Sequence, residues 1–502
     1  MSDKSFFRPS RPRIILFAVV VLSLVLCAAI LASCNKPAEL TPSDTETVYD
    51  MRLDYQGGDK ATLSADILYF NTTGKNLSEL KFHLYPNAFS EGNSNPPYRE
   101  QDKGTFFYDG VSFGGIDVLS AKIDRTTVEY ELCGNGGQIL SVPCNVEKDE
   151  SVTVSLECEL TIPKCRSRYG ITPDSVNLTG FYPSLCVYEN GAWREDEYTP
   201  SGDPFYSETA SFYLRISLPE NYLAATSGEV TERTVSDGTA VLDVTAEHVR
   251  DFALCLSDKF SLSETDFTLD GNEVHVNYFY LNDAKPEETL ALAMDAVETF
   301  SAAFGNYPYP ALTVVQSPLN AGGMEYGSLV IIDASIADES VYRDTVVHEI
   351  AHQWWFGVVG SDQINSPWLD EGLTEFSTAY YHLLKGEESL YAQTVRQSKE
   401  FYLRYENLPQ EIGFDGSMDR PLGSYLTDGE YVAVTYMKGL LLFDSLLQVA
   451  GKDKFNAALS EYYRSCAYKI ATPDDLIAAF SSQGLPVGGI VNGFVDGKVL
   501  LG

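Results

Sequence analysis

Positively charged residues are scarce in this chain of 502 residues. Its 35 Lys and Arg residues stand against 71 Asp and Glu residues, which gives a formal net charge of -36. Binding to nucleic acid needs clustered Lys and Arg side chains that neutralise phosphates. The composition therefore argues against nucleic acid as a partner, and the acidic balance is that of a well-solvated surface.

Several common catalytic and metal-binding patterns are missing as well. The sequence has no phosphate-binding Gly-rich fingerprint and no GxSxG motif, so it gives no support for a serine hydrolase. No CxxC pair occurs among its cysteines, which argues against a zinc site built from cysteine. Seven cysteines follow Cys34, and an odd number cannot all pair within one chain.

The first residues differ from the rest of the chain. Four basic side chains precede an apolar run from Ile14 to about Ala32, which predicts a signal peptide over residues 1–33. The run ends in Leu-Ala-Ser-Cys, which resembles the bacterial lipobox, where cleavage occurs before a lipidated cysteine. We therefore expect lipidation at Cys34 and a membrane-anchored, extracytoplasmic bacterial lipoprotein. An uncleaved membrane helix over the same run is the alternative, and it too places the remainder outside the cytoplasm.

The remaining sequence divides into a β-rich and a helix-rich part. Residues 34–46 lack periodicity and are predicted to form a lipidated, flexible tether. Over residues 47–265, short alternating or β-branched runs are broken by Gly, Asn and Pro, which predicts an all-β domain. Residues 266–502 begin with a strand-like run and continue with helical periodicity from about Pro286 to Phe304, so a mainly helical domain is expected. The predicted fold class is multidomain α+β.

The strongest chemical motif is His348-Glu349-Ile350-Ala351-His352, an HExxH arrangement. Apolar residues at helical spacing surround it and predict that it lies on a helix: Val347, Ile350, Ala351, Trp354 and Trp355. Two histidines four residues apart on a helix point the same way, so both imidazoles can bind one zinc ion. Glu349 between them is placed to act as a general base beside the open coordination position.

A catalytic zinc site needs a third protein ligand, and Glu371 is the candidate. It follows Ser366 and Pro367, which predict a helix N-cap and a first helical position. Glu375 shares a helix face with Glu371 at a spacing of four residues. It is therefore either the acceptor of a hydrogen bond from a ligand imidazole or a merely solvated carboxylate.

Between His352 and Glu371 lie 18 residues, and HExxH followed by 18 residues and a Glu resembles the zinc signature of the aminopeptidase N family of gluzincin metallopeptidases. The resemblance implies one zinc ion per chain, held by His348, His352 and Glu371, and peptides as substrates. It also implies an N-terminal β domain with a saddle-like sheet and a thermolysin-like catalytic domain. Arg168-Tyr169-Gly170 and Asp251-Phe252-Ala253-Leu254 are similar to segments of that β domain.

Two further segments resemble elements of the same family. Gly322-Gly323-Met324-Glu325 is similar to the strand that binds the substrate backbone, with Glu325 at the position that holds the free amino terminus. Pairing of Glu325 with a neighbouring cation is the alternative. Tyr436, which begins Tyr-Met-Lys-Gly, matches the tyrosine that stabilises the oxyanion. Because Tyr436 also shares a helical face with apolar residues, core packing is its alternative.

The sequence also departs from the family. It ends about 65 residues after Tyr436, so we expect no large helical C-terminal domain and a more open cleft. Tyr326 replaces the usual Asn, and no second residue for the amino terminus stands out in the β domain.

The predicted function is removal of N-terminal residues from peptides. A zinc endopeptidase or oligopeptidase and a non-catalytic surface-binding protein on a peptidase fold are the alternatives. The remaining histidines are expected to be structural: His83, His248, His275 and His382.

Overall fold

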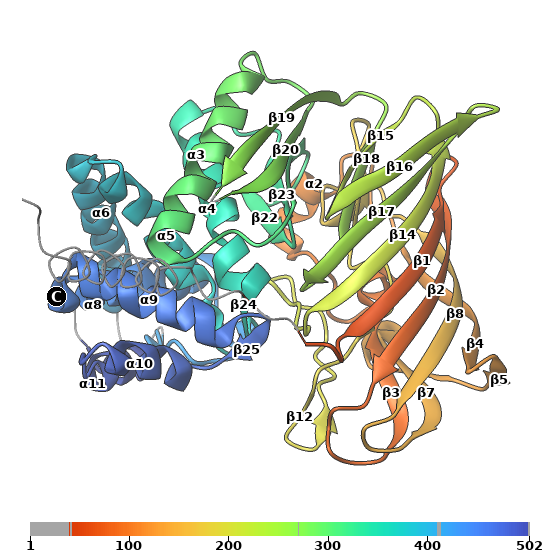
Figure 1. Cartoon of the computed structure of the whole chain (residues 1–502), viewed down its shortest axis with the longest axis horizontal. Helices are drawn as coiled ribbons and strands as arrows, with labels where there is room; N and C mark the ends of the chain where they lie inside the picture. The colour runs from red at the N-terminus through yellow and green to blue at the C-terminus, as the bar shows by residue number, and fades with distance from the viewer. Residues whose placement is uncertain (1–39, 41–42, 270, 409–412, 500–502) are drawn as a thin grey trace, which may run out of the picture. The chain divides into compact units, whose positions relative to one another are not determined.

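The computed structural model describes residue 40 and residues 43–269, 271–408 and 413–499. The predicted signal peptide, the lipidation site Cys34 and most of the tether lie outside the described residues. The chain beyond residue 40 forms one compact unit. Most of its strands come before most of its helices along the chain (Figure 1). The predicted α+β fold class, with an all-β part followed by a helical part, is confirmed.

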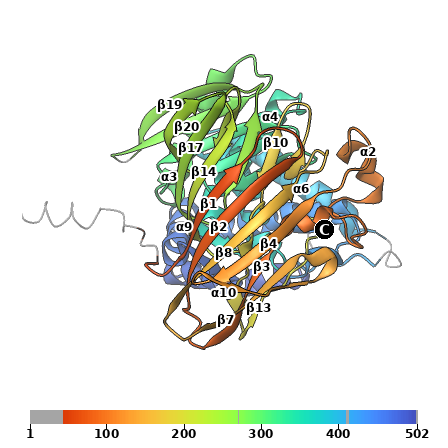
Figure 2. The ribbon, with the colours of Figure 1, turned by 90° about the vertical axis from the view of Figure 1, so that its right-hand side faces the viewer.

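The largest element is an eight-stranded sheet, whose long strands cross Figure 2 side by side. From edge to edge its strands are β16 (Glu229–Ser236), β17 (Thr239–Val249), β14 (Ala210–Pro219), β1 (Thr47–Asp54), β2 (Lys60–Phe70), β8 (Ser151–Thr161), β4 (Gly115–Ile123) and β5 (Thr126–Val128). Neighbouring strands are antiparallel except β1 and β14, which run parallel. Every second residue of β2 from Ala61 to Tyr69 is buried, because successive side chains of a strand point to opposite faces.

Smaller sheets and short helical turns complete the N-terminal part. One four-stranded sheet consists of β15 (Leu223–Thr226), β18 (Ala253–Ser257), β10 (Val176–Thr179) and β9 (Tyr169–Ile171). Another consists of β11 (Ser184–Leu185), β3 (Leu77–His83), β7 (Ile139–Val146) and β6 (Glu131–Cys133). The remaining elements are the hairpin of β12 (Tyr188–Glu189) and β13 (Ala192–Trp193), and the helical segments η1 (Tyr85–Phe89), η2 (Glu100–Asp102), α2 (Lys103–Phe106) and η3 (Asn135–Gly137).

A five-stranded sheet opens the C-terminal part. Its order is β19 (Ser261–Leu269), β20 (Asn272–Tyr280), β21 (Ala311–Ser317), β23 (Leu329–Asp333) and β22 (Gly323–Tyr326). Helix α3 (Pro286–Phe304) joins the parallel strands β20 and β21, and it has the bounds that the periodicity predicts. The chain changes sheet between β18 and β19, so β19 runs across the boundary at residue 265, which stays a prediction. β22 is an edge strand, antiparallel to β23, and one of its two sides has no neighbouring strand in this sheet.

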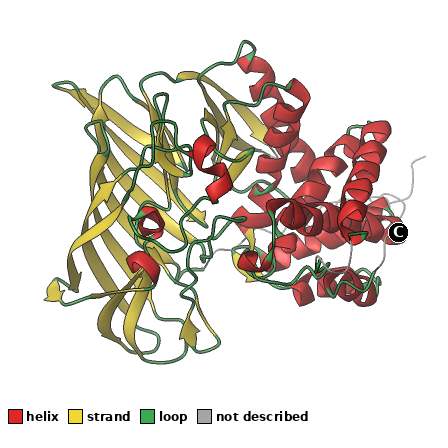
Figure 3. Cartoon of the chain, turned by 180° about the vertical axis from the view of Figure 1, so that it is seen from behind, coloured by secondary structure: helices red, strands yellow, loops and turns green. Residues whose placement is uncertain are grey.

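Helices make up most of the chain after β23 (Figure 3). They are α4 (Glu339–Ala351), η4 (Gln353–Val358), η5 (Pro367–Leu369), α5 (Glu371–Leu384), α6 (Glu388–Glu406), η7 (Leu422–Ser424), α7 (Asp428–Tyr431), η8 (Val432–Met437), α8 (Lys438–Ala450), α9 (Lys452–Cys466), α10 (Pro473–Ser482) and α11 (Gly488–Val495). Two short parallel strands among these helices pair with each other: β24 (Val359–Ser361) and β25 (Lys469–Ala471). The helical stretch Asp428–Ala450 is long and apolar enough to cross a membrane, but 61% of its apolar window is buried within the fold, as in a core helix.

The HExxH helix ends earlier than its apolar pattern predicts. Helix α4 ends at Ala351, His352 is its C-cap, and the wide turn η4 follows with Trp355 and Phe356 outside helical backbone angles. Trp354 and Trp355 are nonetheless buried. Their burial, rather than a continued helix, accounts for the apolar pattern. The second predicted helix start is also shifted, because Pro367 begins the 3₁₀ turn η5 and α5 itself begins at Glu371.

A buried arginine ties the turn η4 to the β-rich part. The Arg250 side chain, which is 3% exposed, donates from Nε to the Phe356 carbonyl over 2.7 Å and from Nη1 to the Ser207 carbonyl over 2.8 Å. Its Nη2 donates to the Lys469 carbonyl in β25 over 3.1 Å. Hydrogen bonds from a charged donor are stronger than neutral ones. One side chain therefore holds three distant segments around the end of the HExxH helix.

Helices α5 and α8 cross at two glycines. A Cβ atom added at Gly439 would lie 2.5 Å from the Cα of Gly372, and one added at Gly372 would lie 2.8 Å from the Cα of Gly439. Carbon atoms in contact prefer separations of about 3.5–4.0 Å, so only glycine permits this approach. Gly372 follows Glu371 directly, and Gly439 comes three residues after Tyr436. The crossing therefore brings these two predicted site residues together.

The close crossing predicts that Gly439→Ala lowers the free energy of unfolding by about 1–3 kcal/mol, because the added methyl group overpacks the contact. Gly489→Ala in α11 is the matched control, since nothing lies within 4 Å of a Cβ atom there. The control should be neutral or should stabilise by up to about 1 kcal/mol. Urea unfolding followed by circular dichroism measures both, and equal effects would contradict a special role for the crossing.

Candidate metal centre and active site

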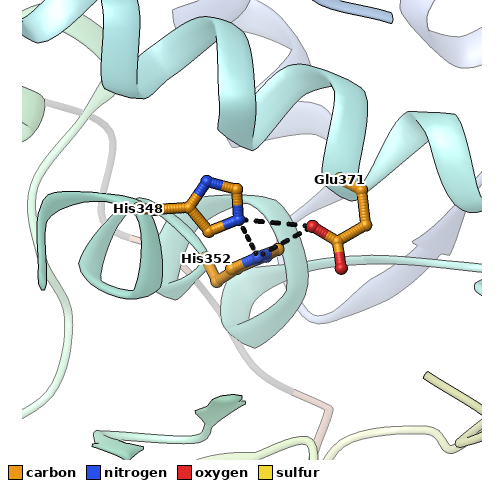
Figure 4. Close-up of side chains that lie close together, drawn as sticks. All are labelled: His348, His352 and Glu371. Atoms are coloured by element: carbon orange, nitrogen blue, oxygen red, sulfur yellow. Dashed lines mark hydrogen bonds and ion pairs between the residues drawn. The ribbon is translucent and has the colours of Figure 1, made fainter. Parts of the chain in front are cut away.

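Three side chains that can bind a metal meet between α4 and α5 (Figure 4). The Nε2 atoms of His348 and His352 are 3.3 Å apart, and Oε2 of Glu371 lies 3.3 Å from the first and 3.4 Å from the second. His348 comes from the last turn of α4, His352 caps that helix, and Glu371 is the first residue of α5. The structure thus brings together the three ligands that the sequence predicts.

These separations fit a tetrahedral zinc ion. With zinc–nitrogen and zinc–oxygen bonds of about 2.0–2.1 Å, two ligands at the tetrahedral angle lie about 3.3 Å apart. Two histidines and one glutamate, with a fourth position left open, form a ligand set of catalytic zinc sites. Both imidazoles turn Nε2 toward the common point, which leaves each Nδ1 atom to bind the protein.

His352 is oriented by a buried carboxylate that the sequence analysis missed. Its Nδ1 lies 2.7 Å from Oδ1 of Asp370, whose side chain is 1% exposed. The other carboxylate oxygen of Asp370 accepts a hydrogen bond from Nε2 of Gln363. A carboxylate behind a ligand histidine fixes the tautomer in which Nδ1 carries the proton and Nε2 is free to bind metal.

His348 has a similar but more exposed arrangement. Its Nδ1 lies 3.2 Å from Oε2 of Glu375 and 3.3 Å from Oγ1 of Thr378. The Glu375 side chain is 23% exposed. Glu375 therefore lies within hydrogen-bonding distance of a ligand imidazole, as its predicted role as an acceptor for that imidazole requires.

Glu349 lies beside the metal ligands and is buried. One of its carboxylate oxygens, one of Glu325 and a ring nitrogen of His352 all lie within 4.8 Å of one another. Burial raises the pKa of Glu349 to about 7, although the two imidazoles act in the opposite direction. A Cβ atom at Gly323 would overlap the Glu349 carboxylate, so the glycine leaves room for this side chain. A carboxylate with a pKa near neutrality is suited to accept and return a proton.

Tyr436 faces the same centre. Its ring is stacked on that of His348, with centroids 6.0 Å apart and an angle of 13° between the planes, and Tyr431 meets it edge-on. Burial raises the pKa of Tyr436 well above its usual value, and the charge of Glu371 adds to this shift. The hydroxyl of Tyr436 therefore stays protonated and available as a hydrogen-bond donor. The alternative role of Tyr436, core packing, does not require such a donor.

A cavity of about 750 Å³ joins these side chains, and its lining includes the three ligands, Glu349, Glu375 and Tyr436. The β-rich part contributes Arg168, Tyr198 and Asp203 to the same lining. Small-molecule sites measure about 300–1,000 Å³, so the space suits a ligand the size of a short peptide. The HExxH helix therefore does not form the site alone.

Strand β22 brings most of its predicted binding residues to this cavity. Gly322, Gly323 and Glu325 line it, whereas Met324 is buried and is not part of the lining. Glu325 is 2% exposed, and its Oε1 accepts a hydrogen bond from Nε2 of Gln363 over 3.1 Å. Among the described residues, no Lys or Arg forms an ion pair with Glu325, whereas a ring nitrogen of His352 lies within 4.8 Å of its carboxylate and opposes the rise in the pKa of Glu325 that burial causes.

The β-rich part supplies a second acid, Asp203, which the sequence analysis did not find. It is 5% exposed and pairs with Arg168, whose Nη1 also donates to the Gly202 carbonyl over 3.1 Å. Burial raises the pKa of Asp203 to about 8; Arg168 lowers it, and the charge of Glu371 raises it further. The cavity therefore contains more buried carboxylates than the described cations beside them neutralise, which favours a cationic ligand group.

The strand β22 is held in place by contacts across the fold. The Asp251 carboxylate accepts a hydrogen bond from the Gly327 amide over 2.9 Å, at the turn after β22. Gln353, the residue after the last ligand histidine, accepts from the Ser328 amide over 2.9 Å and donates to the Tyr326 carbonyl over 3.0 Å. These bonds connect the edge strand and the turn after it to η4, the turn that follows the metal-binding helix.

Comparison with known proteins agrees with this geometry. Residues 288–496 match the Peptidase family M1 domain. This part of the chain is similar to an M1 peptidase domain. It spans α3 to α11 and contains all of the ligands, Glu349, Glu325 and Tyr436.

The matched segment and residues outside it are similar to parts of larger proteins. The chain is 26% identical to Aminopeptidase M1-B of Oryza sativa subsp. japonica over 405 residues, which cover 74% of this chain and 44% of that protein. It is 25% identical to the Tricorn protease-interacting factor F2 of Thermoplasma acidophilum over 225 residues, which cover 41% of this chain and 28% of that protein. The chain thus spans less than half the length of these curated relatives.

The fold matches a solved structure over nearly its whole length. An M1 zinc metallopeptidase from Deinococcus radiodurans superposes with a TM-score of 0.66 at 18% identity, covering 92% of this chain and 96% of that chain. A variant of the same protein bound to the substrate Tyr-Ser-Ala gives a TM-score of 0.64 at 18% identity, with 91% and 95% covered. The architecture of a β-rich part followed by a mainly helical part is therefore shared.

The geometry predicts that Asp370→Asn lowers zinc affinity by about 10–100-fold, because His352 loses the carboxylate that orients it. His348→Ala should lose most of the metal outright, since a ligand is removed. Competition with a chelator, followed by elemental analysis, measures both variants. His275→Ala is the control, because His275 pairs with Asp266 on neighbouring strands, away from the site. Unchanged zinc content in His348→Ala would contradict the assignment.

Proposed function

We propose that this protein is a zinc-dependent aminopeptidase, which removes N-terminal residues from peptides. One observation supports the proposal above all: the cluster of His348, His352 and Glu371 shares a cavity with Glu349 and with the buried carboxylate of Glu325, which pairs with no described Lys or Arg. The first group suits a hydrolytic metal, and the last suits the ammonium group of a free amino terminus. The names of its relatives, such as Aminopeptidase M1-B, support the same reading.

In this proposal each side chain has one task. Zinc held by the three ligands would supply a Lewis acid for the scissile carbonyl and lower the pKa of water. Glu349 accepts a proton from the attacking water and returns it to the leaving amine. The Tyr436 hydroxyl donates a hydrogen bond to the carbonyl oxygen as that oxygen gains negative charge. Asp370 and Glu375 hold the ligand imidazoles in the required tautomer.

Substrate binding follows from the edge strand and the acids around it. The free side of β22 offers backbone donors and acceptors to an extended peptide, which adds to the sheet as a further strand. Glu325 on that strand and Asp203 from the β-rich part receive the substrate ammonium group. The Deinococcus relative bound to Tyr-Ser-Ala supports a short peptide as ligand.

Blocking the amino terminus tests this proposal. Acetylation of a peptide should cost about 2–5 kcal/mol of transition-state binding, because a buried carboxylate is left without its partner. The value of kcat/KM should therefore fall by at least about thirtyfold. Glu325→Ala should remove most of this discrimination, and Glu349→Gln, which retains the ligands, should abolish hydrolysis. Equal kcat/KM values for both peptides, with cleavage at internal bonds, would instead indicate a zinc endopeptidase.

We further propose that the protein is anchored to a membrane outside the cytoplasm by lipid at Cys34. The support is the basic segment, the apolar run and the lipobox-like residues that end at Cys34. The intact mass of protein extracted from membranes provides the test. A mature chain that begins at an acylated Cys34 is expected, whereas a mass that retains residues 1–33 without lipid would contradict the anchor.

A further inference from the structure

The positive charges of the cavity differ in how they are used. Three arginines line it: Arg99, Arg166 and Arg168. Arg168 pairs with Asp203, and Nη2 of Arg99 lies 2.6 Å from Oδ1 of Asp428. Arg166 is exposed and forms no ion pair with any described residue; its Nη1 donates to the Thr105 carbonyl over 3.2 Å. An otherwise acidic cavity thus contains one arginine free to bind an anion.

Arg166 lies close along the chain to Arg168, the partner of Asp203, which is one of the two acids proposed for the amino terminus. It precedes by two residues Arg168, the partner of Asp203, and two residues of backbone span at most about 7 Å. Its own amide donates to the Phe106 carbonyl over 2.8 Å, so the backbone at this point is fixed. Each extended residue of a peptide spans about 3.3 Å. The backbone span from Arg166 to Arg168 is thus no longer than about two extended peptide residues, and both arginines line the same cavity as Asp203 and Glu325.

The segment 97–106, here called the strap, forms the wall of the cavity next to Arg166. Arg99 of the strap pairs with Asp428 at the start of α7 and donates to Oγ of Ser201 over 2.6 Å. Thr105 of the strap donates to Oδ1 of Asn320, two residues before Gly322, over 3.4 Å. The strap therefore contacts the segment that leads to Tyr436 and the segment that leads to β22. These contacts enclose the cavity on the side where Arg166 lies.

We propose that Arg166 binds a carboxylate of the peptide substrate and that the preferred substrates are short peptides, such as tripeptides, whose C-terminal carboxylate reaches it. The inference rests on the proposed function, because the amino terminus must lie at Glu325 and Asp203 for the far end to meet Arg166. Arginine suits the role, since its planar guanidinium binds a carboxylate through two parallel hydrogen bonds. The acids hold one end of the peptide and Arg166 holds the other.

Three tripeptides test the proposal: Leu-Gly-Gly, its C-terminal amide, and the C-terminal amide of Leu-Gly-Glu. Their dissociation constants are measured by calorimetry on the zinc-loaded full chain carrying Glu349→Gln, and their kcat/KM values on the unsubstituted enzyme. The free acid should bind about fivefold more tightly than its amide, as befits a partly exposed ion pair, and the ratio should shrink in high salt. A Glu side chain that restores binding of the amide would identify a side-chain carboxylate as an equally good partner of Arg166. Absence of that restoration would identify the terminal carboxylate as the partner.

Substitutions at Arg166 decide the assignment. Arg166→Gln should make the acid and the amide bind equally, and Arg166→Lys should keep part of the preference. Arg233→Gln is the matched control. Arg233, on β16, is also exposed, and it donates to one backbone carbonyl, that of Glu220. Equal binding of acid and amide by the chain with Arg166 intact, or a preference that persists in Arg166→Gln, would overturn the proposal. If no peptide is hydrolysed but the affinity ratio is as expected, the proposed function fails and the carboxylate site stands.

Discussion

The site depends on one geometric constraint: three donor atoms from two helices must lie about 3.3 Å apart around a common point. Helix α4 and its C-cap supply two of the three donor atoms, those of His348 and His352, because residues four apart share a face. The position of the third donor atom depends on where α5 begins, since Glu371 is the first residue of that helix. The glycine crossing of α5 and α8 and the bonds from Arg250 to the turn η4 fix that relation. Packing contacts of residues that follow the ligands closely along the chain thus help to set the separation of the ligands.

Charge is the second constraint. Burial raises the pKa of Glu325, Glu349 and Asp203, since the charged form of a carboxylate is costly away from water. The described cations nearest to them are Arg168 and the two ligand imidazoles. A fold that gathers so many acids in one cavity costs stability unless positive charge arrives with a ligand. The gathering of these carboxylates therefore favours metal ions and ammonium groups over neutral ligands.

Local features of the fold were predictable from the sequence, and long-range ones were not. The bounds of α3 follow from periodicity, and the pairing of the two histidines follows from their spacing. The end of α4 at Ala351 was not foreseen, because buried tryptophans continue the apolar pattern into a turn that is not an α-helix. Asp203 and Arg168 are 35 residues apart, and Arg250 bonds to carbonyls 106 and 219 residues away. No spacing rule links residues that only the folded chain brings together. The role of Asp370 behind His352 was not predicted for a different reason. Its neighbour Glu371 matches the spacing of the third zinc ligand, and that spacing assigns no role to the residue before it.

The edge strand β22 has a consequence for which chains can enter. A backbone N–H or C=O group that already serves a helix or a sheet is not free to pair again. A segment that aligns with the free side of β22 must therefore be extended and have one free edge, which excludes a helical segment. The strand has four residues and lies in the wall of a cavity, so a folded surface cannot approach it. Under the proposed function, the cavity thus accepts extended peptides and excludes folded chains before any side chain is recognised.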